Sequence, residues 1–184
     1  MSNKTLLLTS STMATSDQMR LNKTLAISTS LLASGAILSL SAYTVPVLNA
    51  RSTDAASSKA SLHQLRSIFS SGSHVFPQLA ILSSGLFGYL ATNAASASNA
   101  RLFTAAAVSV AAILPFTAFV MVPASNGRLI ELEAKAKEGG EEAVGKEGGD
   151  AEVTELLERF GQLNFVRGVL IGLGGILGAW ASID

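Results

Sequence analysis

Long stretches without a charged residue are the feature that most constrains how this chain folds. Three of them cover residues 24–50, 67–100 and 102–127, and a shorter one covers residues 168–183. An α-helix needs roughly 20 apolar residues to cross a hydrocarbon layer about 30 Å thick, so the first three stretches are long enough. The fourth spans only if a snorkelling Arg167 and the two residues before it complete it. The chain is therefore predicted to be an integral membrane protein.

The expected fold is all-α, a bundle of four transmembrane helices with a charged, partly disordered loop between the third and the fourth. Residues 1–20 are rich in Ser and Thr and are expected to form a flexible tail. Residues 21–184 are expected to form a single membrane domain, in which the polar segment 50–66 connects the first two helices. The four spans are placed at about residues 25–48, 75–95, 102–122 and 165–183.

Local patterns add detail to the second half of the chain. Pro115 removes a helix hydrogen bond and is expected to kink the third span. The segment 138–152 is mostly Gly, Glu and Lys, which predicts a mobile loop. Residues 153–164 then have apolar side chains at helical spacing and lead into the fourth span. Glycines spaced four apart predict close helix packing there. These are Gly168 with Gly172, and Gly174 with Gly178.

Composition argues against several classes of function. The chain has no cysteine and only two histidines, so neither a disulfide framework nor a transition-metal site is predicted. Its formal net charge is +0, which gives no electrostatic reason to expect a nucleic acid as partner. The glycine run 172–178 does not match a nucleotide-binding fingerprint, because Leu177 stands at the third glycine position and no strand precedes the run.

Four polar residues at the membrane boundaries are the candidates for chemistry. His74 opens the second span and is either a proton acceptor or an interfacial histidine bonded to a loop carbonyl. Asn126 either caps the next helix or holds a substrate oxygen. Asn164 and Arg167 are three residues apart and face the same way on a helix. An arginine entering a span marks either function or a snorkelling contact with lipid phosphate.

The distribution of basic residues predicts a membrane orientation. With four spans, the loops 50–66 and 128–167 share one side and hold nine of the 13 Lys and Arg residues. The positive-inside rule places these loops in the cytosol and both termini in the lumen, in an endomembrane such as the endoplasmic reticulum. Asn3 lies in an Asn-Lys-Thr acceptor pattern and is then a candidate glycosylation site. The oligomeric state is left open.

Two groups of residues resemble the signatures of the anthrone oxygenase-like membrane proteins, and the resemblance covers about residues 25–182. One group lies on and after the third span, and the other follows the acidic loop. Phe160 departs from the pattern, which has tryptophan there, so an indole donor is absent. The residues that carry the resemblance are Pro115-Phe116-Thr117, Pro123, Asn126 and Leu129, then Leu156-Leu157, Phe160, Leu163-Asn164 and Val166-Arg167, with Gly35, Gly72 and Pro77-Gln78-Leu79-Ala80.

The resemblance implies an enzyme of fungal aromatic polyketide biosynthesis that oxidises an anthrone to an anthraquinone. It implies molecular oxygen as co-substrate, membrane lipid as surroundings, and no flavin, haem or metal cofactor. His74 is then the candidate base for the benzylic proton, and its replacement by alanine is expected to lower turnover by a factor of ~10² or more. Arg167, Asn126 and Asn164 are expected to stabilise the developing oxyanion.

Two other classes of function stay open at this point. One is a non-catalytic scaffold or accessory protein that recruits soluble pathway enzymes through the acidic loop and its amphipathic flanks. The other is a small-molecule carrier, although transporters usually have internal repeats and no convincing repeat is present here. An enzyme predicts activity in isolated membranes, a scaffold predicts none without its partners, and a carrier predicts movement of the compound without chemical change.

Overall fold

The computed structural model describes residues 3–51, 55–135 and 149–183, and these residues form helices joined by short turns, with no strand among them. Two segments, η1 and η2, are π-helices, which are wider than α-helices. The elements in chain order are α1 (Asn3–Ser39), η1 (Leu40–Thr44), α2 (Val45–Arg51), α3 (Ala55–Thr92), α4 (Ala97–Ala111), α5 (Ile113–Phe116), η2 (Thr117–Asn126), a helix over residues 127–135, and α7 (Gly149–Trp180).

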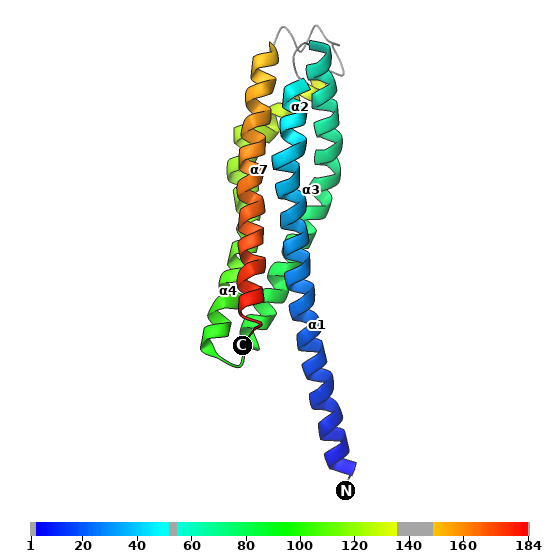
Figure 1. Cartoon of the computed structure of the whole chain (residues 1–184), viewed down its shortest axis with the longest axis vertical. Helices are drawn as coiled ribbons and strands as arrows, with labels where there is room; N and C mark the ends of the chain where they lie inside the picture. The colour runs from blue at the N-terminus through cyan, green and yellow to red at the C-terminus, as the bar shows by residue number, and fades with distance from the viewer. Residues whose placement is uncertain (1–2, 52–54, 136–148, 184) are drawn as a thin grey trace.

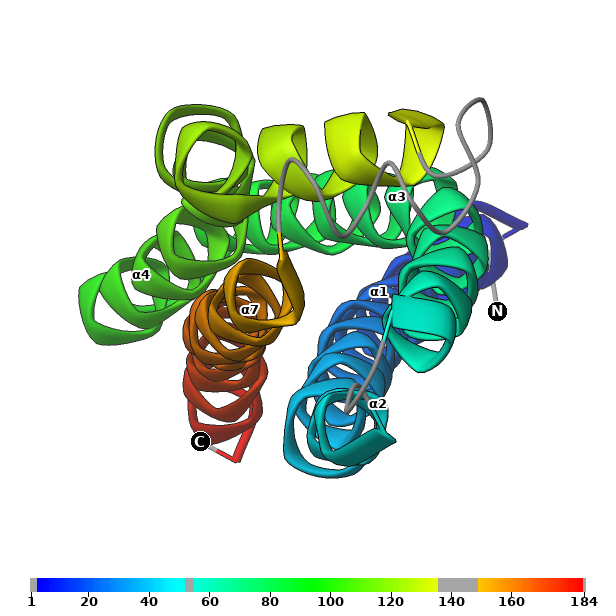
Figure 2. The same cartoon turned by 90° about the horizontal axis from the view of Figure 1, so that it is seen from above.

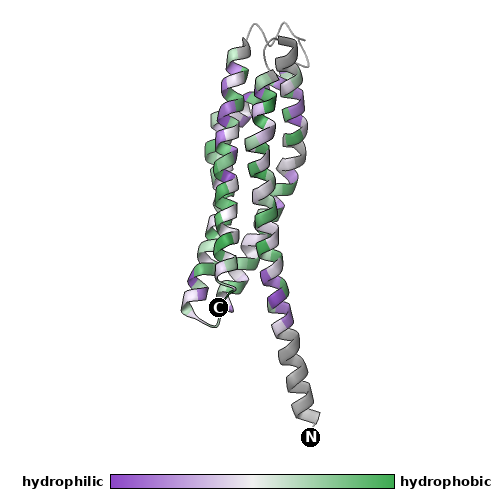
Figure 3. Ribbon diagram, in the orientation of Figure 1, coloured by the Kyte–Doolittle hydropathy of each residue, from purple (hydrophilic) through white to green (hydrophobic). Residues whose placement is uncertain are grey.

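Four helical stretches are long and apolar enough to cross a membrane, which confirms the predicted four-span all-α fold. The first and third run beyond the spans expected from the sequence at both ends, whereas the second and fourth begin earlier than expected and end about three residues earlier. Hydrophobic residues line the middle of the bundle, and hydrophilic ones gather at one end and where α1 leaves the bundle (Figure 3). The four stretches are Ser16–Ala50, His74–Thr92, Ala97–Lys135 and Ala151–Trp180.

The four long helices form a ring in which each contacts two main neighbours. α1 packs against α7 and α3, and α4 packs against the same two helices (Figures 1 and 2). The helix over residues 127–135 turns away from α4 and crosses toward the start of α3 (Figure 2). Arg128 ties it to α7 through an ion pair with Glu152, 2.8 Å between Nε and Oε1. Both ends of the described chain lie toward the same end of the bundle (Figure 1).

Helices extend further along the chain than the sequence predicts. The segment 1–20, expected as a flexible tail, is helical from Asn3 onward, and α1 has no glycine or proline before Gly35 to interrupt it. The polar connector 50–66 is helical from Ala55 and continues directly into the second span. The expected mobile loop 138–152 lies mostly outside the described residues, and α7 has already begun at Gly149.

The core is divided into two apolar clusters, one at each end of the bundle. One cluster joins α2, the first part of α3, η2 and the first part of α7, with Leu62, Met121 and Leu157 almost fully buried. The other joins α1, α3, α4 and the second half of α7 around Phe87 and Phe103, whose stacked rings have centroids 6.5 Å apart. Between the two clusters the packing is incomplete, and a cavity remains there.

The glycines of α7 allow close helix contacts, as predicted. Ser34 on α1 donates a hydrogen bond to the carbonyl of Gly168, 2.7 Å away, and also faces Gly172. Gly174 and Gly178 face the other way, toward Val110 of α4 and Phe87 of α3. One helix therefore packs tightly against three others because it has small residues on two faces.

This packing makes a prediction about stability. A Cβ added at Gly178 meets Phe87, with Cζ at 2.7 Å, so Gly178→Ala is expected to destabilise the bundle by about 1–3 kcal/mol. Gly88→Ala is the matched control, since a Cβ there has nothing within 4 Å. Thermal unfolding in detergent measures both. Equal melting temperatures for the two variants would contradict the packing described for α7.

Irregular helix geometry explains why the bundle does not close in its middle. Pro77 in α3 and Pro115 in α5 each remove a backbone hydrogen bond, and η2 begins two residues after Pro115. Gly72 lies one turn before Phe76, and its lack of a side chain leaves room for the Phe76 ring, 3.1 Å from where a Cβ would lie. Departures from α-helical geometry within long helices are often found at functional sites. Here they widen the bundle at one level, between the two apolar clusters.

Candidate active site

The cavity between the two clusters has a volume of about 320 Å³, inside the range of roughly 300–1,000 Å³ typical of small-molecule sites. Its walls come from η1, α3, α5, η2 and α7. Thirteen residues line it, and ten of them are apolar or glycine. The three polar ones are Thr117, Asn164 and Arg167.

Arg167 is the one charged residue in the lining, and its side chain is almost fully buried, with 8% of its surface exposed. Its Nη1 lies 3.7 Å from the sulfur of Met121, and its Nε has no hydrogen-bond partner. Among the described residues, no carboxylate lies within ion-pair distance of it. The burial rules out the alternative in which Arg167 snorkels to lipid phosphate. An unpaired guanidinium in an apolar cavity is costly and favours an anionic ligand.

Asn164 lies one helical turn before Arg167, and both line the cavity, as their spacing predicts. Its amide nitrogen donates to the carbonyl of Ile37 at 3.3 Å and to the hydroxyl of Ser41 at 3.2 Å, which joins α7 to α1 and η1. Its side-chain carbonyl accepts no hydrogen bond from the residues that the structure describes. The amide of Asn164 is thus held in place through its nitrogen, and its carbonyl oxygen is left to accept a hydrogen bond from a ligand.

The π-helical segment η2 supplies the wall next to Arg167. Thr117, Ala118 and Val122 face the cavity, and Met121 contacts the guanidinium. The hydroxyl of Thr117 donates to the carbonyl of Ile113 at 2.7 Å, so it is occupied by its own helix. Neither Thr117 nor Met121 was among the site residues expected from the sequence. Thr117 carried part of the family resemblance, but the direction in which a π-helix points its side chains does not follow from α-helical spacing.

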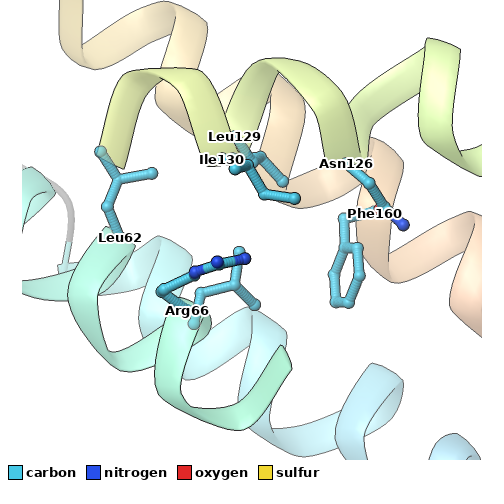
Figure 4. A pocket seen from close by; sticks show the side chains of 7 residues that line it. Leu62, Arg66, Asn126, Leu129, Ile130 and Phe160 are labelled. Atoms are coloured by element: carbon cyan, nitrogen blue, oxygen red, sulfur yellow. The ribbon is translucent and has the colours of Figure 1, made fainter. Parts of the chain in front are cut away.

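Asn126 lies near this cavity but does not line it. It is 2% exposed and lies at the end of η2, where the helix continues without a break, so it does not cap a new helix. It borders a second, smaller pocket, and Phe160 lines both that pocket and the cavity. Figure 4 shows the amide of Asn126 beside the Phe160 ring. The structure therefore brings Asn164 and Arg167 together and places Asn126 behind Phe160.

His74 is exposed and does not line the cavity. Its neighbours Gly72 and Phe76 do line it. Because an α-helix turns by about 100° per residue, a side chain two positions from each of them points to the opposite side of α3. Asn3 is the first residue of α1, and its side chain lies outside the described part.

Comparison with known proteins gives a consistent result. The family model described as Anthrone oxygenase matches residues 65–177. The chain belongs to the anthrone oxygenase family. It is 36% identical over 170 residues to Anthrone oxygenase encC of Aspergillus fumigatus, an alignment covering 88% of this chain and 92% of that one. It is 32% identical over 148 residues to Anthrone oxygenase AgnL2 of Paecilomyces divaricatus, covering 79% and 85%. No solved structure matches it significantly.

The match to the anthrone oxygenase family covers the part of the chain that builds the cavity. Of the residues that line the cavity, only Leu40 lies outside the matched range. The chain before residue 65 contributes α1, which packs against α7. The carbonyl of Ile37 on α1 accepts a hydrogen bond from the amide of Asn164. Within the described residues, no group of three or more His, Cys, Asp or Glu side chains is placed to hold a metal ion.

Proposed function

We propose that this chain is an anthrone oxygenase, which oxidises an anthrone to an anthraquinone with molecular oxygen. The observation that carries the proposal is the buried, unpaired guanidinium of Arg167 in an apolar cavity. Such a site favours a flat apolar molecule that becomes an anion. An anthrone that loses a proton from its central methylene carbon is a molecule of this kind. The family membership and the names of the relatives support the same function.

The anion carries its charge on the central carbon and on the ketone oxygen. We assign the ketone oxygen to Arg167, whose Nε–H is free to donate to it. The side-chain carbonyl of Asn164 is available to accept a phenolic O–H of the substrate. None of the residues found to line the cavity is His, Asp or Glu, so in this proposal the proton leaves with water. The guanidinium drives ionisation by stabilising the anion in a medium of low dielectric constant.

The reaction with oxygen then follows from the electron-rich carbon. One electron passes from the anion to dioxygen, and the carbon radical combines with superoxide to form a C–O bond. The peroxide takes up one proton, the same carbon loses its second proton, and the O–O bond breaks to leave a carbonyl and water. One anthrone and one dioxygen thus give one anthraquinone and one water. Because no other oxidant or reductant is needed, we propose that the reaction proceeds without a bound cofactor.

The test uses membranes from a heterologous host that expresses the chain. Emodin anthrone is supplied, and quinone formation and oxygen uptake are followed against membranes from an empty-vector strain, because anthrones also oxidise slowly in air. We expect a saturable rate above that background. A rate equal to the background, from protein shown to be folded and inserted, would contradict the proposal and favour a scaffold that recruits soluble pathway enzymes.

The position of His74 makes a separate prediction. Because His74 lies outside the cavity lining, His74→Ala is expected to change kcat/KM by less than about twofold in the same assay. The sequence alone predicts a loss of ~10² or more for a catalytic base at this position. A loss of that size in folded protein would return the role of base to His74.

We further propose that the protein acts in an endomembrane with both termini in the lumen, as the distribution of Lys and Arg indicates. Glycosylation of Asn3 depends on that orientation. A shift in gel mobility on treatment with a glycosidase, absent in Asn3→Gln, is the expected result. A protease-accessible N-terminus on the cytosolic side would contradict it.

A further inference from the structure

A second pocket, much smaller than the cavity, lies on the other side of Phe160. Its volume is about 20 Å³. A void needs roughly 10–15 Å³ to hold one water molecule, so this one has room for about one small molecule. Most of its wall is apolar and comes from α3, the helix over residues 127–135, and α7 (Figure 4). The apolar side chains are those of Leu62, Leu65, Leu129, Ile130 and Phe160.

Two nitrogen donors without partners complete this pocket. The Nδ2 of Asn126 is buried and makes no hydrogen bond. Arg66 makes no ion pair or hydrogen bond with any of the residues in the ranges 3–51, 55–135 and 149–183. Figure 4 shows its guanidinium extending toward the space bounded by Leu129, Ile130 and Phe160. The pocket thus combines an apolar wall with a positive charge and an amide N–H.

We infer that this pocket binds the dioxygen consumed in the reaction, an inference that rests on the proposed function. A buried water is held by two to four polar partners, and this pocket offers only two, both nitrogen donors, among five apolar residues. Dioxygen is apolar, so it enters such a pocket without losing hydrogen bonds. Once it accepts an electron it becomes an anion. Arg66 and Asn126 then stabilise the superoxide in place.

The location beside the cavity matches the order of the chemical steps. Phe160 lines both the pocket and the cavity, so only the Phe160 side chain separates the bound oxygen from the substrate. The substrate anion gives one electron to the oxygen, which leaves a carbon radical in the cavity and superoxide in the pocket. The two combine past Phe160, a C–O bond forms, and the peroxide proceeds to carbonyl and water. Atoms and electrons balance as in the overall reaction.

The experiment measures steady-state oxygen uptake at saturating emodin anthrone while the dissolved oxygen is varied. Leu129→Phe fills the pocket and is expected to raise the KM for oxygen at least about fivefold, with the KM for anthrone unchanged. Arg66→Met removes the charge and keeps the volume, and is expected to lower kcat/KM for oxygen by about tenfold, whereas Arg66→Lys retains most of it. Leu173→Phe is the matched control, on an exposed face of α7.

A second measurement does not depend on turnover. Xenon is an apolar atom that enters apolar protein cavities, and its binding to the detergent-solubilised protein is followed by xenon NMR. We expect xenon to bind, to compete with oxygen in the uptake assay, and to be excluded by Leu129→Phe. Normal oxygen dependence in both Leu129→Phe and Arg66→Met, with active wild type, would overturn the oxygen site and leave the proposed function standing. An inactive wild type would instead overturn the proposed function.

Discussion

Replacing Arg167 by methionine is expected to lower kcat/KM for an anthrone by a factor of about 10²–10³, because the anion loses its main electrostatic partner. The same change is expected to leave the melting temperature equal or higher. A buried charge without a counterion is costly, and an unbranched apolar side chain of similar length removes that cost. A residue whose replacement lowers turnover strongly without weakening the fold has a functional role and not a structural one.

The control for this prediction is Arg159→Met, which makes the same change on the same helix at an exposed site. Its ion pair with Glu155 is on the surface, so it contributes little to stability and nothing to the cavity. Kinetics and thermal unfolding are measured for both variants. A large loss of stability in Arg167→Met would show that Arg167 is a structural residue, and unchanged turnover would remove it from the mechanism.

Replacing Thr117 by tryptophan is expected to reduce kcat/KM by about 10², mainly through binding, because the indole occupies the space that the substrate needs. The cavity of about 320 Å³ leaves little spare volume for a three-ring molecule. Thr117→Val keeps the shape and removes the hydroxyl. It is expected to remain active, since that hydroxyl is bonded to the carbonyl of Ile113.

Thr104→Trp is the matched control for occlusion. Thr104 makes the same kind of hydrogen bond, from its hydroxyl to the carbonyl of Ala100 four residues earlier, but it is exposed on α4. Wild-type kinetics are expected for this variant. If Thr117→Trp also turned over at the wild-type rate, the substrate would bind somewhere other than this cavity.

The sequence was sufficient to predict the parts of the fold that depend on local pattern. The charge-free stretches gave the four spans, and the spacing of Gly168, Gly172, Gly174 and Gly178 gave the close packing of α7. The pairing of Asn164 with Arg167 was predictable as well, because a continuous helix with no break between them fixes the relation of residues three apart.

Features that depend on how helices are rotated or widened were not predictable. The direction of His74 is set by α3 packing its Gly72 and Phe76 side toward the cavity. Asn126 was expected as a possible helix cap, but η2 runs through Asn126 and the helix continues beyond it without a break. The cavity itself arises where irregular segments of several helices meet, and no single stretch of sequence contains that information.

We propose that Arg167 makes the cavity a site for the anion of an anthrone, and an anaerobic absorption spectrum tests this role. Unsubstituted anthrone has no phenol, so an anion band at long wavelength reports only loss of the methylene proton. Purified protein is mixed with it under nitrogen at neutral pH, with Arg167→Met as the comparison. We expect the anion band with wild type and none with the variant. Tight binding of anthrone to the wild type in its neutral form would contradict it.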